Sequence, residues 1–368
     1  MVGAAIFFGL FFGICISILL WPRRRARRRA HQAGQPPQVS ILVAARNEEA
    51  SIERCLRSLA ALNYPAGQLE ILIADDHSTD HTAAVVRAFI RDKPQFQLLS
   101  VRHDLGSARG KSNALAYLCR AATTDYFLFT DADMALRPDW VTAMLAAATP
   151  GVGIVTGITT AGGGLFGRLQ GLDWLFGLRL IHLLAEAGLP GSSVGNNMLV
   201  VRAAYSDVGG FEALPFSTNE DLQLFRHIVD RGWRFRNLCQ PAVLGVSEPQ
   251  PTVAALLQQR KRWMKGGARL PWYLSGLFGL YGVFYAVLFW PDLLPLGPLL
   301  LIYGGKVALQ TLFLASALRQ VGHRERLGVL LLYEPYLCLM SLSVLAYALW
   351  PSPVEWKQRR YAWAEGGG

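Results

Sequence analysis

The sequence is poor in cysteine and in charged residues for its length. Five of its 368 residues are cysteine, and no two of them have the CxxC spacing. We therefore expect free thiols and no zinc site. Charged residues make up 17% of the chain and hydrophobic residues 52%. This composition allows one sizeable soluble core together with several membrane spans.

The N-terminal residues 2–21 carry no charge and are long enough to cross a bilayer core of about 30 Å. Six arginines follow this span directly, whereas a cleaved signal peptide would place its positive charges before the apolar stretch. Without these six, the net charge of +10 falls to +4. Such a cluster can also indicate a nucleic-acid surface, but its place beside the span favours membrane topology. We expect residues 1–22 to anchor the chain in the plasma membrane, residues 23–38 to form a basic linker, and the next domain to face the cytosol. We expect no nucleic-acid partner.

From residue 39 the pattern changes to short apolar runs that alternate with segments of helical periodicity. This alternation predicts a doubly wound α/β domain with a mostly parallel sheet, over residues 39–267. The expected strands cover residues 39–44, 69–74 and 126–130, and the expected helices cover residues 50–61 and 82–89.

Two acidic clusters directly follow expected strands: Asp75 with Asp76, and Asp131 with Asp133. In such sheets, ligands bind beyond the carboxyl ends of the strands. Either cluster alone could be a helix cap or a turn. Together they would repel each other in one crevice, and a bound Mg²⁺ or Mn²⁺ would relieve that repulsion.

A glycine-rich stretch ending in Lys111 superficially suggests a phosphate-binding P-loop. It is one residue short, because three residues rather than four separate Gly106 from Gly110. Lys111 is then either a positive charge near a bound nucleotide or a surface lysine.

Two further motifs lie later in the domain. Glu220 and Asp221 open a helical stretch, where acids are also favoured by the helix dipole. One of them could accept the proton of an attacking hydroxyl. Gln259, Arg262 and Trp263 precede a long apolar region, where a basic stretch is usually interfacial. Arg262 could instead stabilise a diphosphate, and Trp263 could stack against an acceptor.

These motifs, in this order, resemble those of the membrane-bound family 2 glycosyltransferases. The likeness rests on Ala45-Arg-Asn47-Glu48, Tyr64-Pro65, Asp75-Asp76-His-Ser-Thr-Asp80, Gly110-Lys111, Asp131-Ala-Asp133, Glu220-Asp221 and Gln259-x-x-Arg262-Trp263. It implies a GT-A nucleotide-sugar domain. The resemblance assigns nucleotide binding to Asn47, Glu48, Asp75, Asp76, Lys111 and Asp131, the metal to Asp133 and Asp131, general-base catalysis to Asp221 supported by Glu220, and the acceptor or diphosphate to Gln259, Arg262, Trp263 and Asn197.

By this resemblance we expect an inverting, metal-dependent enzyme that transfers a sugar from a nucleotide-sugar, a UDP-sugar in our interpretation, to an amphiphilic acceptor. We favour a single transfer to a lipid such as a sphingolipid, a hopanoid or a carotenoid-type alcohol, without a required protein partner. The alternative is a processive polysaccharide synthase. A non-catalytic nucleotide-binding scaffold would have missing or substituted acids, and each of the expected acids is present.

The remaining chain predicts a membrane region over residues 268–350 and a basic tail over residues 351–368. Apolar segments at residues 272–290, 297–318 and 327–350 are candidate spans. Three crossings would leave the basic tail outside, which conflicts with the preference of basic segments for the cytosol. Either one segment is re-entrant, as a break at Glu334-Pro335 permits, or the tail departs from the rule. Lys306 and Glu334 are expected to pair across this bundle or to line a lipid groove.

Overall fold

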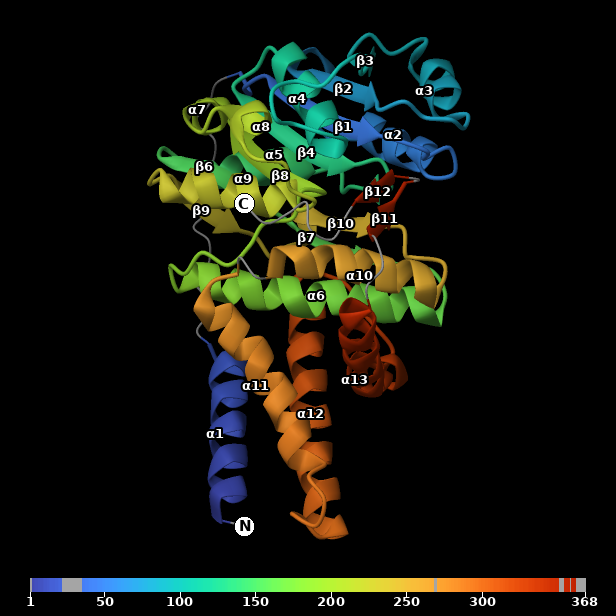
Figure 1. Ribbon diagram of the computed structural model, residues 1–368. Helices are drawn as coiled ribbons and strands as arrows, with labels where there is room; N and C mark the ends of the chain where they lie inside the picture. Colours follow the sequence, from blue (N-terminus) through green and yellow to red (C-terminus); the bar gives the residue numbers. More distant parts are fainter. Residues whose placement is uncertain (1, 22–34, 268–269, 351–353, 358, 362–368) are drawn as a thin grey trace.

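A computed structural model describes residues 2–21, 35–267, 270–350, 354–357 and 359–361. The arginine run that follows the first span lies outside these residues. Figure 1 shows three levels: an α/β domain, a layer made of two long helices beneath it, and a group of helices that extends away from that layer. The layer consists of α6 (Leu165–Glu186) and α10 (Val253–Gly267), and the extending helices are α1 (Val2–Leu19), α11 (Trp272–Leu288) and α12 (Leu296–Gln320).

The domain is built on a seven-stranded sheet of order β3-β2-β1-β4-β8-β6-β9. Each neighbouring pair is parallel except the two pairs that include β8. This mostly parallel sheet confirms the predicted fold class. Its strands are β1 (Val39–Ala45), β2 (Leu69–Asp75), β3 (Phe96–Ser100), β4 (Tyr126–Asp131), β6 (Val152–Thr156), β8 (Asn197–Val201) and β9 (Arg234–Asn237).

Helices cover both faces of this sheet because successive side chains of a strand point to opposite faces. In β1, Ile41 and Val43 belong to one apolar core, whereas Leu42 belongs to the other. One core also contains residues of α2 (Ile52–Ala60), α3 (Thr82–Ile90) and α5 (Trp140–Ala147). The other contains residues of α4 (Lys111–Ala121), α7 (Arg202–Asp207), α8 (Gly210–Ala213) and α9 (Glu220–Asp230).

A small second sheet joins the domain to the helix layer. Its order is β5 (Met134–Ala135), β10 (Leu244–Ser247) and β7 (Ile158–Ala161), and short 3₁₀ turns lie at Ala66–Gln68 and Pro241–Val243. β7 packs closely on α6 at Gly171, where an added Cβ would lie 2.3 Å from the carbonyl oxygen of Ala161. Glycine at this position therefore lets the layer approach the domain.

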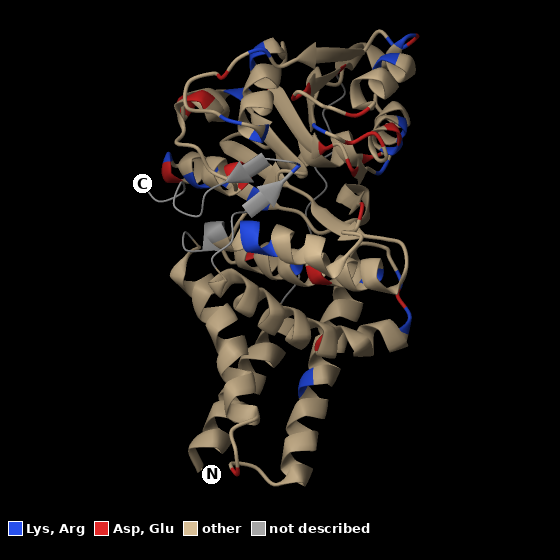
Figure 2. Ribbon diagram, turned by 45° about the vertical axis from the view of Figure 1, so that its right-hand side comes forward, with Lys and Arg blue, Asp and Glu red and all other residues tan. Residues whose placement is uncertain are grey.

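Within the described part of the chain, three helices are long and apolar enough to cross a membrane, judged by length and composition: α1, α12 and α13 (Leu327–Leu349). α11 is also apolar but has 17 residues. Figure 2 shows that charged residues gather in the domain and the helix layer, while the extending helices are nearly free of them. A stalk of this composition suits the interior of a bilayer.

α13 does not extend away with the other apolar helices but stays against the layer. In its first half the Tyr333 hydroxyl donates to Asp173 of α6 at 3.1 Å. After its end, the Trp350 carbonyl accepts a hydrogen bond from Lys261 of α10 at 2.7 Å. Both ends of α13 are therefore held on the domain side of the stalk.

The predicted pairing of Lys306 with Glu334 is confirmed. Both side chains are fully buried, and the Lys306 ammonium contacts one oxygen of Glu334. The same ammonium donates to the Tyr285 hydroxyl at 2.7 Å and to Gln310 Oε1 at 3.0 Å. Four polar side chains on α11, α12 and α13 are thus bonded to one another in apolar surroundings.

We expect charge reversal at one of these positions to destabilise the protein strongly and reversal at both to restore it. Breaking a buried pair by changing one partner costs about 3–5 kcal/mol, because the other charge stays buried without compensation. Thermal unfolding of Lys306→Glu, Glu334→Lys and the double variant measures this. A double variant no more stable than either single change would show that the pair does not hold the helices together.

Candidate active site

Lys111 joins two of the predicted acidic motifs. It begins α4 directly after Gly110, whose φ of 57° lies in the left-handed region that glycine adopts without strain. Its ammonium lies 2.7 Å from Asp131 Oδ1 and 3.2 Å from Glu220 Oε1. Burial alone would lower the pKa of Lys111, but the two carboxylates raise it above the ordinary lysine value. Lys111 is thus a permanent cation between the ends of β4 and α9.

Two cavities meet at this lysine. One, of about 420 Å³, opens toward the ends of β1 and β2, and we call it the donor-side cavity. The other, of about 580 Å³, runs from α9 down to α6 and α11, and we call it the acceptor-side cavity. The structure therefore brings the four separate motifs into one connected site. Both cavities are lined by Lys111, Asp131, Asp133, Gln259 and Arg262.

Asp131 and Asp133 have the surroundings of cation ligands. Asp133 Oδ2 accepts a hydrogen bond from Ser247 at 3.1 Å, while its buried Oδ1 has no hydrogen-bond partner. Burial, together with the nearby charges of Asp131 and Glu48, raises the pKa of Asp133 to about 7. A divalent cation between Asp131 and Asp133 would remove this repulsion.

The ion would need ligands beyond these two side chains. Across the described parts of the chain, no three His, Cys, Asp or Glu side chains form a ready metal cluster. Mg²⁺ usually keeps only one or two protein carboxylates and completes its shell with water and substrate phosphates. Asp131 and Asp133 fit that arrangement.

The predicted nucleoside-binding residues divide into two groups. Glu48 and Asp76 line the donor-side cavity, and the side chain of Asp76 is almost fully buried. Asp75 and Asn47 lie nearby but do not line it. Asn47 Oδ1 instead accepts the backbone N–H of Thr79 at 2.9 Å and so shapes the loop after β2. The structure therefore brings two of these four side chains to the cavity.

Asp221 lies in the first turn of α9 and lines the acceptor-side cavity. Its Oδ2 accepts the backbone N–H of Gly195 at 2.7 Å, and its Oδ1 accepts that of Leu222 at 2.8 Å. Burial raises the pKa of Asp221, and the Glu220 charge raises it further, although Lys111 and the two N–H groups oppose the shift. An acid held in this way suits proton transfer.

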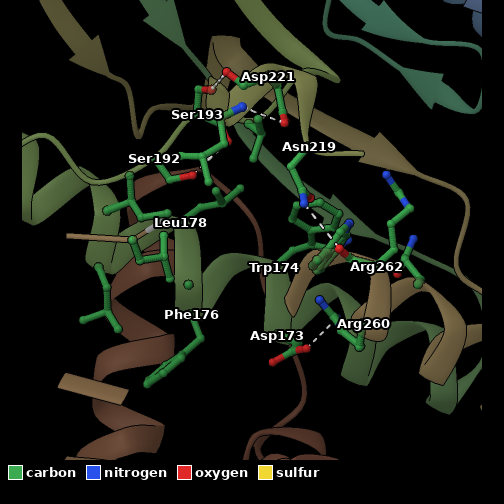
Figure 3. A pocket seen from close by; sticks show the side chains of 18 of the residues that line it. Asp173, Trp174, Phe176, Leu178, Ser192, Ser193, Asn219, Asp221, Arg260 and Arg262 are labelled. Atoms are coloured by element: carbon green, nitrogen blue, oxygen red, sulfur yellow. Dashed lines mark hydrogen bonds and ion pairs between the residues drawn. The ribbon is translucent and has the colours of Figure 1, made fainter. Parts of the chain in front are cut away.

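The α10 motif forms the border between the two cavities. Gln259 and Arg262 line both, and Trp263 lines the acceptor-side cavity. The Trp263 ring is held by the Arg260 guanidinium, 4.2 Å from its centroid, and by the edge of Trp174, at 4.7 Å. Figure 3 shows Arg260 beside Asp173, with which it forms an ion pair of 2.5 Å. Trp263 is thus a fixed aromatic surface in the cavity that Asp221 also lines.

The prediction that Asn197 contacts the acceptor is not supported by its position. Its side chain is fully buried, with Oδ1 accepting from Trp140 Nε1 at 2.8 Å and Nδ2 donating to the carbonyls of Ile158 and Val243. Asn197 therefore ties three segments of the core together. Its neighbour Asn196 lines the acceptor-side cavity instead.

Two parts of the site lie outside the site residues that the sequence assigned. The lower wall of the acceptor-side cavity is apolar and comes from α6 and α11. Figure 3 shows Phe176 of α6 below Asp221 in this cavity. In addition, Lys357 of the C-terminal tail lines the donor-side cavity. The sequence shows a basic stretch of six residues around Lys357, but the position of this stretch beside the cavity depends on the path of α13.

Known glycosyltransferases are similar to this chain in sequence. The β-monoglucosyldiacylglycerol synthase of Synechocystis sp. is 31% identical over 235 residues, which cover 63% of this chain and 48% of that protein. The poly-β-1,6-N-acetyl-D-glucosamine synthase of Staphylococcus epidermidis is 28% identical over 236 residues, covering 62% and 54%. The chain spans about half the length of the curated relatives it matches.

A solved structure shares the fold over nearly the whole chain. The mannosyltransferase of Pyrobaculum calidifontis, in complex with GDP-Man and Mn²⁺, has a TM-score of 0.58 and 19% sequence identity, covering 95% of this chain and 96% of that one. The resemblance to GT-A glycosyltransferases is thereby confirmed for the fold.

The family model described as Glycosyl transferase family 21 matches residues 4–368. The chain therefore belongs to glycosyl transferase family 21.

Proposed function

We propose that this glycosyltransferase moves one sugar from a UDP-sugar to the hydroxyl group of a membrane lipid, with inversion and with Mg²⁺ or Mn²⁺. One observation carries the proposal: a single cavity connects the carboxylate of Asp221 with an apolar wall at the top of the stalk. Such a cavity suits an acceptor with a polar head and a hydrophobic chain.

The apolar wall consists of side chains against which part of a lipid chain can pack. Phe176 and Leu180 of α6 and Leu277, Phe278 and Tyr281 of α11 contribute to it. Moving hydrocarbon against such side chains is favourable by about 25 cal/mol for each Å² of apolar surface removed from water. The name of one similar protein agrees with a lipid acceptor, because the Synechocystis relative is a β-monoglucosyldiacylglycerol synthase.

The geometry supports one displacement step. The lipid hydroxyl attacks the anomeric carbon of the sugar, its proton passes to the Asp221 carboxylate, and the bond from that carbon to the diphosphate oxygen breaks. Glu220 is paired with Lys111, so Asp221 is the more available base. Lys111 and Arg262 lie where the two cavities meet and can stabilise the departing diphosphate. A single displacement of this kind inverts the anomeric configuration.

Asp131 and Asp133 would hold the divalent cation. When bound, such an ion supplies positive charge beside the leaving diphosphate. In its absence the crowding of Asp131, Asp133 and Glu48 opposes the approach of a further anion, which is why we include the ion in the proposal.

A processive polysaccharide synthase is the second candidate, and the Staphylococcus epidermidis relative has such a name. A growing polysaccharide needs a path lined by polar groups, because its hydroxyls must keep their hydrogen bonds. The wall that leads from Asp221 toward the stalk is instead apolar. This favours a lipid in that space.

We infer three membrane crossings, by α1, α11 and α12, with α13 lying along the membrane surface. An odd number of crossings places the N-terminus on one side and both the catalytic domain and the tail on the other. The arginines after the first span favour the cytosol for the domain. This arrangement removes the conflict between the basic tail and three C-terminal crossings, and the contacts of Tyr333 and Trp350 support it.

The decisive experiment is incubation of the purified protein, in lipid, with a panel of UDP- and GDP-sugars, followed by mass spectrometry of the extracted lipids. We expect one lipid species whose mass rises by a single sugar, formed from a UDP-sugar and lost when EDTA removes divalent ions. A ladder of polymer masses would favour the second candidate. Transfer that continues in EDTA would contradict the role of the metal.

A further inference from the structure

The C-terminal tail returns to the catalytic domain as a short hairpin. β11 (Val354–Trp356) and β12 (Arg359–Tyr361) pair antiparallel, with Trp356 opposite Arg359. Figure 1 shows the hairpin beside the domain, at the level of β10. Lys357 follows β11 directly and has a φ of 47°, the left-handed conformation that two-residue hairpin turns require. This turn directs Lys357 toward the donor-side cavity.

Lys357 contacts the loop that follows β1 through three interactions. Its ammonium lies 2.9 Å from Glu48 Oε1 and donates to the carbonyl of Asn47 at 3.1 Å. Its own carbonyl accepts a hydrogen bond from Arg46 Nε at 3.1 Å. Arg46 in turn donates to the carbonyl of Asp76 at 2.6 Å. The hairpin is therefore bonded to the residues that form the nucleoside end of the predicted site.

The charge of Lys357 also matters at this end of the cavity. Glu48, Asp76, Asp131 and Asp133 all line the donor-side cavity, and the Glu48 charge contributes to the raised pKa of Asp133. Lys111 is already engaged with Asp131 and Glu220 on the other side of the cavity. Lys357 is thus the ammonium group that balances Glu48.

The path of the chain holds the hairpin in place. Lys261 of α10 fixes the Trp350 carbonyl just before the hairpin, and its helix also carries Gln259 and Arg262. Earlier in α10, the Gln258 side chain donates to the Tyr347 hydroxyl at 2.6 Å. The same helix that borders the two cavities therefore anchors the segment that leads into the hairpin.

We propose that the C-terminal hairpin is part of the donor site and that Lys357 is a positioning residue, which holds Glu48 and the end of β1 in the shape that receives the nucleoside diphosphate. This inference rests on the proposed nucleotide-sugar donor. It assigns residues 354–357 and 359–361 to the donor site, a role that the sequence pattern of a basic membrane-flanking tail did not indicate.

The test uses the full chain in lipid nanodiscs and measures UDP binding by calorimetry. We expect Lys357→Ala to weaken UDP binding by about tenfold, the effect of losing one charge-assisted interaction, and Lys357→Arg to stay close to wild type. The donor KM should rise by the same factor, while kcat and the acceptor KM are unchanged. Lys93→Ala, on the domain surface between α3 and β3, is the matched control and should bind UDP as wild type does.

A second measurement avoids any dependence on activity. The Lys357→Cys variant should react with a maleimide more slowly when UDP is present, relative to the wild-type background. UDP affinity that is unchanged in Lys357→Ala, or labelling that UDP does not slow, would overturn the inference while leaving the proposed function in place. A wild-type protein that binds GDP but not UDP, and whose GDP affinity Lys357→Ala lowers, would retain the hairpin's role and correct the donor. A wild-type protein that binds neither would overturn both.

Discussion

The Asp221→Asn variant is expected to lose sugar transfer, with kcat falling by about 10²–10⁴-fold, while UDP binding stays as in the wild-type protein. A carboxamide cannot accept the proton of the attacking hydroxyl. Asp221 lines the acceptor-side cavity but not the donor-side cavity, so nucleotide affinity should not change. Initial rates with a saturating donor, together with calorimetry of UDP binding, measure the two effects separately.

The variant must also be shown to fold. Asp221 accepts two backbone N–H groups, from Gly195 and Leu222, and an amide oxygen can replace only one of its two carboxylate oxygens. An unsatisfied N–H costs about 1–3 kcal/mol, so we expect a modestly lower Tm. Asp230→Asn, an exposed change at the other end of the same helix, is the matched control. If Asp221→Asn turns over at the wild-type rate, the assignment of the base is wrong.

The sequence was informative wherever a strand is buried on both faces. β1, β2 and β4 are largely apolar, because helices cover both sides of the sheet, and the predicted bounds differ from the observed ones by one residue. The position of β9 could not be predicted in this way. It is an edge strand of sequence Arg-Phe-Arg-Asn, and it depends on pairing with β6 rather than on its own burial.

The acidic motifs were predictable for a related reason. Parallel strands end at the same edge of a sheet, so the acids at the ends of β2 and β4 lie at one edge, on either side of β1. Asn197 shows the limit of this reasoning. It begins β8, where successive side chains alternate in direction, so Asn197 points into the core while Asn196 faces the cavity. A motif identifies the segment but not which of two adjacent residues faces the ligand.

The role of the tail could not be predicted because hydropathy describes composition and not direction. Residues 327–350 are apolar enough to cross a bilayer, and the sequence offered crossing and re-entry as alternatives. The choice depends on specific polar contacts, such as that of Tyr333 with Asp173, between residues far apart in the sequence. Only when α13 stays at the layer can Lys357 reach the end of β1.

The second large effect is expected for Asp133→Asn, which should lower metal-activated transfer by about 10²–10³-fold. A divalent ion contributes several kcal/mol of charge stabilisation to a departing diphosphate, and a loss of about 3–4 kcal/mol has this effect on rate. Asp133 offers a buried oxygen without a hydrogen-bond partner, directly beside Asp131. The measurement is kcat/KM as a function of Mn²⁺ concentration.

Thermal unfolding separates a lost ligand from a damaged fold. Without metal, Asp133→Asn should not lower the Tm, because it removes a charge that Asp131 repels and its amide oxygen can still accept from Ser247. The rise in Tm that Mn²⁺ with UDP gives the wild-type protein should disappear, since a ligand stabilises only the state that binds it. Asp139→Asn, an exposed change outside both cavities, should keep that rise. A full Mn²⁺-dependent rise in the Tm of Asp133→Asn would mean that the ion is bound elsewhere. The assignment of the metal to Asp131 and Asp133 would then be wrong.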